Sequence, residues 1–192
     1  MDISKNTFRF IILLATCALL VFADYRNSLR ICKIECVISP LGRLRVVNES
    51  CTIKAMSRYR TAINADAYLL EPFDDVLINM QIFKKNSVTY IPYLVNITVN
   101  ICKFLGGDSV GAAGFYTRFM IGWVNKYSNV NHSCPYSGLL WVRNLEPFAD
   151  KIPVFAPIGD YRLDLHFYQS SLKNLLATVR GYGTIKLKPY ME

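Results

Sequence analysis

The sequence predicts an all-β fold: an antiparallel β-sandwich of about eight strands with an immunoglobulin-like architecture and one short helical insertion. Apolar and polar residues alternate along a long central stretch, and several shorter stretches repeat this period of two. Only one stretch has the spacing of a helix. A parallel sheet would need a helix at each crossover, so the antiparallel arrangement is expected.

The central stretch runs from Ser87 to Leu105 and has the clearest strand pattern. Isoleucine, valine or tyrosine fills the odd-numbered positions 91–101, whereas Asn96, Thr98 and Asn100 fill even-numbered positions. Successive side chains of a strand point to opposite faces of the sheet. One face of this strand is therefore expected in the core and the other in solvent.

Other stretches with strand character precede and follow the central one. A different period is found from Val110 to Lys126, where aromatic residues recur at helical spacing and Ser109 is a suitable N-cap. This stretch is the expected helical insertion. The other strands are expected at Arg30 to Ile38, Arg43 to Val47, Cys51 to Arg60, Ala62 to Leu70, Val76 to Lys85, Tyr136 to Arg143, Tyr161 to Tyr168 and Leu176 to Leu187.

The N-terminus has the pattern of a secretory signal peptide. Lys5 and Arg9 flank an apolar run over 10–22, and Ala23 ends a small-residue cleavage pattern. Residues 1–23 are therefore expected to be removed, which leaves 24–192 as a single secreted, extracellular sandwich domain. An uncleaved signal anchor is the alternative, although the apolar run is short for a bilayer span.

The charge balance is basic. Loss of the signal peptide lowers the formal net charge from +8 to +7. This balance favours anionic partners such as lipid headgroups, carboxylates or glycans, or it only keeps the surface solvated. No nucleic-acid-binding motif is present, so nucleic acid is not an expected partner. Basic residues two apart would share one side of a strand at Arg43/Arg45, Arg58/Arg60 and Lys186/Lys188.

Five cysteines remain after cleavage, and disulfides are their expected state in an oxidising compartment. Cys32 and Cys36 would lie about 13 Å apart on one strand, which is too far for a mutual bridge. Cys51, across a Pro-Leu-Gly turn, is expected to pair with one of these two. Cys102 with Cys134 is the preferred second pair. The leftover thiol is expected to be buried or to join two chains.

Three sequons match the N-glycosylation acceptor pattern, at Asn48, Asn96 and Asn131. A single triplet occurs easily by chance, but three of them behind a signal peptide favour a glycosylated surface. Asn96 lies on the polar side of the central strand.

One motif raises the alternative of an enzyme. Residues 107–111, Gly-Asp-Ser-Val-Gly, match G-x-S-x-G with Ser109 in the nucleophile position. Asp160 or Asp164, followed by His166, gives the chain order of an α/β-hydrolase. An α/β-hydrolase needs a parallel sheet covered by helices, which this sequence does not predict. We therefore expect no enzyme and no catalytic residue. An esterase is kept as the third hypothesis, after the two binding functions described below. Ser109 is interpreted as a helix cap.

A metal site or other cofactor is not expected either. The chain contains only His132 and His166, and no Cys/His set has the spacing of a zinc site.

Four segments carry a family resemblance, the most specific being the Asn-His-Ser-Cys-Pro run within 127–136. The others are Cys51 to Ala55, Tyr93 to Leu105 and Pro157 to Tyr161. In this order and spacing the chain resembles an insect family of secreted proteins, the domain of unknown function ten-ninety-one. That family is similar in architecture to lipid-recognition sandwiches of the ganglioside-activator and sterol-transfer type, which hold a hydrophobic molecule between two sheets without catalysis.

The resemblance and the alternation together predict a secreted, non-catalytic protein that binds a small hydrophobic ligand, a lipid or a chemosensory hydrocarbon. A basic rim would orient an anionic headgroup, and a receptor is a further candidate partner. An extracellular interaction protein with a solid core, which binds a protein or a glycan, is the alternative, because aromatic residues can also fill a closed core. The expected ligand-lining residues are Ile91, Tyr93, Val95, Ile97, Val99, Tyr161, Leu163, Leu165 and Phe167.

Overall fold

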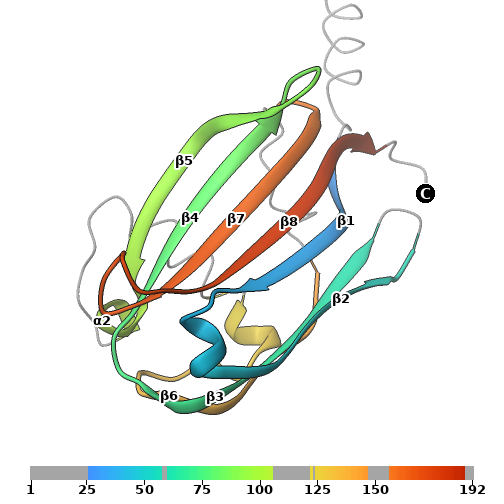
Figure 1. Ribbon diagram of the computed structural model, residues 1–192. Helices are drawn as coiled ribbons and strands as arrows, with labels where there is room; N and C mark the ends of the chain where they lie inside the picture. The colour runs from blue at the N-terminus through green and yellow to red at the C-terminus, as the bar shows by residue number, and fades with distance from the viewer. Residues whose placement is uncertain (1–25, 58–59, 106–121, 123, 147–155, 189–192) are drawn as a thin grey trace, which may run out of the picture.

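A computed structural model describes residues 26–57, 60–105, 122, 124–146 and 156–188. Two antiparallel sheets make up these parts of the chain, one with the strand order β1-β8-β7-β4-β5 and the other with the order β2-β3-β6 (Figure 1). This arrangement confirms the predicted all-β sandwich. The strands are β1 (Arg26–Ile38), β2 (Val46–Ala55), β3 (Thr61–Phe73), β4 (Val76–Lys85), β5 (Tyr90–Asn100), β6 (Tyr136–Leu145), β7 (Gly159–Gln169) and β8 (Leu175–Lys188).

The central strand is shorter than the sequence predicts. β5 ends at Asn100, and the short helix α2 (Ile101–Leu105) follows directly. The side-chain oxygen of Asn100 accepts a hydrogen bond from the backbone N–H of Lys103 at 3.0 Å, which is the contact of a helix cap. The prediction of strand up to Leu105 is therefore wrong for its last five residues.

A second expected strand segment is also helical. Gly42–Leu44 forms the 3-10 turn η1 instead of strand, because the Ser39 side chain accepts a hydrogen bond from the backbone N–H of Gly42 at 2.9 Å. The strand therefore resumes only at Val46. A second 3-10 turn, η2, spans Asn125–Tyr127.

Some predictions fall on parts of the chain that the structure does not describe. These are the signal peptide over 1–23, the motif at 107–111 with Ser109, and most of the helical insertion over 110–126. In the described ranges, no helix combines the length and the apolar character needed to cross a membrane.

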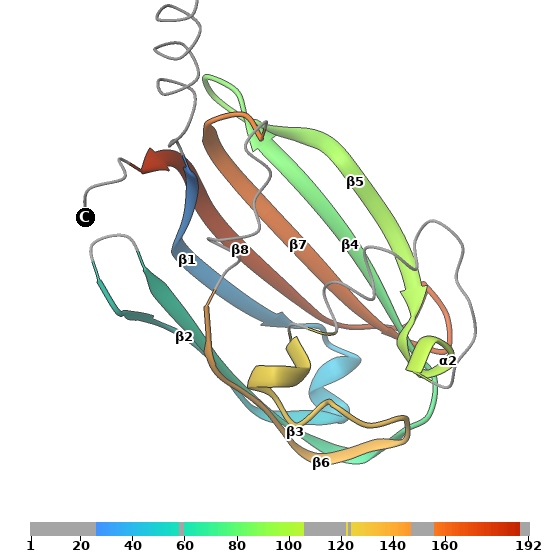
Figure 2. The same cartoon turned by 180° about the vertical axis from the view of Figure 1, so that it is seen from behind.

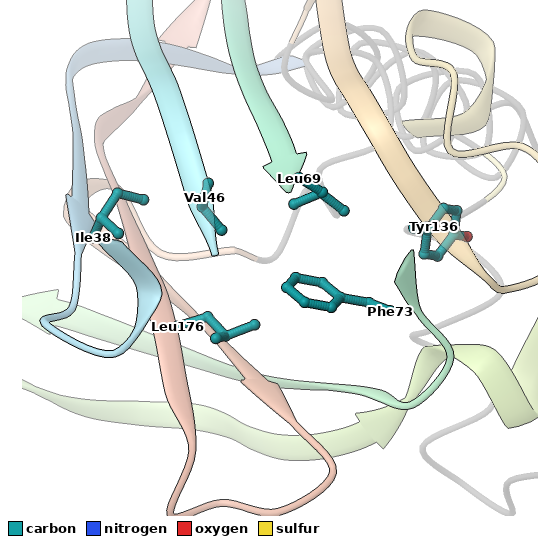
Figure 3. Packing of buried hydrophobic residues seen from close by; sticks show 6 residues of the cluster. All are labelled: Ile38, Val46, Leu69, Phe73, Tyr136 and Leu176. Atoms are coloured by element: carbon teal, nitrogen blue, oxygen red, sulfur yellow. The ribbon is translucent and has the colours of Figure 1, made fainter. Parts of the chain in front are cut away.

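The closed part of the core lies where the two sheets converge (Figures 1 and 2). Its six buried side chains come from β1, β2, β3, β6 and β8 and point toward one another, each at most 8% exposed (Figure 3). Burying this apolar area stabilises the contact between the sheets. The six residues are Ile38, Val46, Leu69, Phe73, Tyr136 and Leu176.

Two disulfides lie in the described part of the chain. Cys36–Cys51 joins β1 to β2, and so links one sheet to the other, with the two Cα atoms 6.0 Å apart. Cys102–Cys134 joins α2 to the segment before β6. Cys36 is thus the cysteine that pairs with Cys51. Cys32, included among the expected disulfide cysteines, is instead a free, exposed thiol at a bulge in β1. Of the two expectations for the leftover thiol, burial is therefore wrong, and a link between two chains stays a prediction.

The disulfide arrangement makes a direct prediction for peptide mapping under non-reducing conditions. The peptides that contain Cys36 and Cys51 should remain linked, as should those that contain Cys102 and Cys134. Cys32 should react with iodoacetamide in the folded protein because its thiol is exposed. A peptide that links Cys32 to Cys51 would contradict this arrangement.

The closed core makes a second prediction. Phe73→Ala should lower the free energy of unfolding by about 3–5 kcal/mol, because Phe73 is only 3% exposed and its removal leaves a cavity. Leu44→Ala is the control, since Leu44 is 74% exposed, and its effect should stay within about 0.5 kcal/mol. Denaturant unfolding with the disulfides intact measures both values. Equal effects of the two substitutions would place the core elsewhere.

Candidate functional site

The five-stranded sheet has one apolar face, which three neighbouring strands build. Residues paired across an antiparallel ladder share a face of the sheet. Met80 of β4 pairs with Ile97 of β5 and with Leu165 of β7. The register extends this pattern along the strands. We call the following set the apolar face: Ile78, Met80, Ile82, Val95, Ile97, Val99, Leu163, Leu165 and Phe167.

The apolar face is the one that looks toward the three-stranded sheet. Leu165 pairs with Val179 of β8, and Val179 pairs in turn with Cys36 of β1. These three residues therefore lie on one face, and Cys36 is bonded to Cys51 of the other sheet. The alternation that the sequence predicts for β5 and β7 thus corresponds to an interior face.

The apolar face is only half-buried. Val99 is 5% exposed, whereas the other eight side chains of this face are intermediate in exposure. None of the nine belongs to the buried core cluster or packs against it as one of its partly buried neighbours. From that cluster the two sheets diverge toward the β4–β5 hairpin (Figures 1 and 2). The apolar face therefore continues beyond the closed core.

Ile91 lies on the same side of the sheet as the apolar face, because it pairs with Lys84, which pairs in turn with Tyr161, but its side chain is exposed rather than half-buried. Gln81 pairs with Asn96, but Phe83 pairs with Pro92, so three residues of β5 lie opposite one residue of β4. This bulge interrupts the regular pairing of β5. Ile91 lies beyond it and is 47% exposed.

Two tyrosines and a lysine lie at the hairpin end of the apolar face. The rings of Tyr93 and Tyr161 meet edge to face with centroids 5.8 Å apart. Lys84 Nζ lies 5.6 Å from the Tyr93 centroid and 5.8 Å from the Tyr161 centroid, which is a cation–π arrangement. Burial, together with the neighbouring Tyr93, raises the pKa of the Tyr161 phenol, so it stays neutral. We call these three residues the Tyr–Lys rim.

The opposite face of the same sheet is polar and contains a buried carboxylate. Asp164 is 4% exposed, and its carboxylate accepts a hydrogen bond from Arg162 Nε at 2.8 Å, with Arg180 Nε 3.8 Å away. Arg162 also lies over the Phe83 ring, 4.2 Å from its centroid. Asp164 is therefore paired by charge and covered by its neighbours, a role that the sequence pattern did not indicate.

A second ion pair lies on β1 next to this polar face. Lys33 Nζ lies 2.5 Å from the Glu35 carboxylate, and the Tyr182 hydroxyl donates to the same carboxylate at 3.1 Å. These hydrogen bonds, that of Lys33 first, lower the pKa of Glu35 below its usual value. The Glu35 carboxylate is thus held in its charged form.

The residues considered for hydrolysis do not form an Asp–His pair. Asp160 accepts a hydrogen bond from the Thr184 hydroxyl at 2.7 Å, and Asp164 binds arginine. His166 Nδ1 lies 3.0 Å from the hydroxyl oxygen of Thr178. The Thr178 contact takes up one ring nitrogen of His166. Among the described residues, no group of three His, Cys, Asp or Glu side chains is placed to hold a metal ion.

The basic pairs expected on outer strand faces contain residues that form ion pairs. Arg45 lies 2.6 Å from the Glu71 carboxylate, and Arg60 lies 2.7 Å from that of Glu146. Arg43 lies in η1, so Arg43 and Arg45 do not share a strand as expected. Lys186 is exposed on β8. The described part of this basic set is therefore partly neutralised.

The comparison with known protein families matches the segment that builds most of this site. Residues 78–163 match the model of the family described as "Protein of unknown function (DUF1091)". No curated protein matches the chain. The matched segment contains nearly all of β4, β5 and β6 and the start of β7, and so includes the Tyr–Lys rim. The predicted resemblance to the DUF1091 family is confirmed by this match over residues 78–163.

Proposed function

We propose that this protein is a secreted, non-catalytic binding protein whose apolar face holds a small hydrophobic ligand, a lipid or a chemosensory hydrocarbon, between the two sheets. The observation that carries the proposal is the half-buried state of the apolar face, which faces the interior yet lies outside the closed core. Covering such a surface contributes roughly 25 cal/mol of favourable binding free energy per Å² of apolar area removed from water. A hydrophobic ligand would supply that cover.

The Tyr–Lys rim supports an amphiphilic ligand with an anionic headgroup. Lys84 carries a positive charge at the hairpin end of the apolar face, where Tyr93 and Tyr161 hold it by their rings. A carboxylate or phosphate group there would pair with the ammonium, while the hydrocarbon part lies along the apolar face. At the same place, each tyrosine contributes an apolar ring that ends in a polar hydroxyl.

The disulfides and sequons support secretion and N-glycosylation. Two disulfides are typical of a chain that folds in an oxidising compartment. The asparagine side chains of all three sequons, Asn48, Asn96 and Asn131, are exposed, as a glycan would require. These observations agree with the proposed extracellular location.

The second candidate is an extracellular interaction protein with a solid core. The observation that favours it is an exposed apolar group on the three-stranded sheet: Tyr68 is 43%, Leu70 55% and Leu139 51% exposed. Tyr68 pairs with Leu139 across β3 and β6, so the two side chains share one face of the sheet. Exposed apolar patches of this kind mark contact sites for other proteins.

Ligand binding by the apolar face predicts a difference between two neighbouring residues of β7. Leu165→Gln should weaken uptake of a fluorescent fatty acid about tenfold or more, because it places an amide on the apolar face. His166→Gln is the matched control, since residue 166 points to the opposite face, and uptake should be unchanged. Fluorescence titration measures both affinities, and circular dichroism checks that both variants fold.

The same titration on the unmodified protein separates the two candidate functions. Native mass spectrometry of protein from its own tissue should detect a co-purifying lipid or hydrocarbon, which solvent extraction releases. A protein that holds no such molecule and takes up no fluorescent fatty acid would contradict ligand binding and favour the interaction protein.

The Tyr–Lys rim predicts headgroup selectivity. Lys84→Gln should weaken binding of a fatty acid while leaving binding of the fatty alcohol with the same chain nearly unchanged, because only the carboxylate pairs with the ammonium. Competition against the fluorescent probe gives both affinities. Lys173→Gln, on the turn between β7 and β8, is the control for a general loss of positive charge. Equal losses for acid and alcohol would exclude Lys84 as the headgroup contact.

A further inference from the structure

Four exposed aliphatic residues lie in or next to the half of the five-stranded sheet that ends in the β4–β5 turn. Leu94 is 86%, Val88 83%, Ile158 55% and Ile91 47% exposed. Val88 lies in the β4–β5 turn, Ile91 and Leu94 lie in the first half of β5, and Ile158 directly precedes β7. Figure 1 shows that the β4–β5 turn and the start of β7 lie at one end of the molecule. We call these four residues the apolar tip.

Leu94 is unfavourable for the fold on two counts. Its backbone has φ +55°, in the left-handed region that most side chains avoid. The other described non-glycine residues with positive φ are Asn48, Asn144 and Ser170, all small and polar. Leu94 is also almost fully exposed, so no packing compensates for this conformation. The fold alone therefore does not account for a leucine at this position.

The surroundings of the apolar tip are aromatic and basic. Tyr90, Tyr93 and Tyr161 are half-buried behind it, and Lys85 is exposed at the end of β4. Lys85 pairs with Tyr90, and Lys84 pairs with both Ile91 and Tyr161 across the two ladders. The two lysines therefore lie along the strands between Leu94 and the turn that contains Val88. Tyrosine and lysine occupy the headgroup level in membrane proteins, below which aliphatic side chains reach the acyl region.

We propose that the apolar tip docks this protein on the surface of an anionic phospholipid bilayer. Val88 and Leu94 insert into the acyl boundary, the tyrosines lie at headgroup level, and Lys84 and Lys85 face the anionic headgroups. Charge complementarity favours a bilayer as the occupant, because the ammonium groups of Lys84 and Lys85 outnumber the neighbouring carboxylate of Asp160 on β7. Docking requires no ligand in the interior, so it goes beyond the proposed function.

The decisive variant is Leu94→Asn, which removes the aliphatic side chain and supplies a residue that tolerates positive φ. Its thermal stability should equal or exceed that of the wild type. Its partition onto vesicles of phosphatidylcholine mixed with phosphatidylserine should fall about tenfold. Leu44→Asn is the control, since Leu44 is 74% exposed in η1, away from the tip, and its partition should match the wild type. Co-sedimentation with the vesicles measures each partition.

Charge is tested with Lys85→Gln, which should weaken partition onto the mixed vesicles but not onto phosphatidylcholine alone. The proposal is overturned if the wild type fails to sediment with the mixed vesicles, or if Leu44→Asn loses as much as Leu94→Asn. It is equally overturned if analytical ultracentrifugation shows that the only effect of Leu94→Asn is to convert a dimer of this protein into monomers. Fatty-acid uptake without vesicles should be unchanged in Leu94→Asn, so a failure of docking is distinguishable from a failure of ligand binding.

Discussion

The attachment of the two sheets at one end is the constraint on which the rest of the structure depends. The buried cluster around Phe73 and Leu176 and the Cys36–Cys51 disulfide hold the sheets together there. The cluster supplies apolar burial, and the disulfide restricts how far β1 and β2 can separate in the unfolded chain. Because the sheets diverge from this attachment (Figure 2), the apolar face of β4, β5 and β7 is left half-buried.

The two faces of the five-stranded sheet differ in how their side chains are shielded from water. On the apolar face, aliphatic side chains need cover that the closed core does not provide. On the polar face, the Asp164 carboxylate is buried by the residues that neutralise it, since Arg162 lies along its own strand and Arg180 pairs with it from β8. A charge with two cationic partners avoids the penalty of an unpaired buried ion. The charged side chains of the polar face thus shield one another from solvent, whereas the aliphatic side chains of the apolar face need cover from outside the closed core.

Much of the fold follows from the period of two. The alternation in β5 and β7 correctly predicts the interior face, since side-chain direction in a strand is set locally. The end of β5 was missed because the cap at Asn100 depends on one hydrogen bond. The bulge that exposes Ile91 depends on pairing with β4, and the choice of Cys36 over Cys32 depends on a bulge in β1. The two bulges arise from pairing between distant segments, which a pattern along one strand does not contain.

The bulge in β5 also bears on self-association. β5 is the outer strand of its sheet, and an outer strand offers unpaired backbone N–H and C=O groups to any other extended chain. Pro92 has no N–H to offer, and the left-handed turn of the backbone at Leu94 breaks the regular spacing of the remaining groups. Another extended chain therefore cannot form an uninterrupted ladder of backbone hydrogen bonds along this edge. The same irregularity that exposes Leu94 protects the sheet from growing into a fibril.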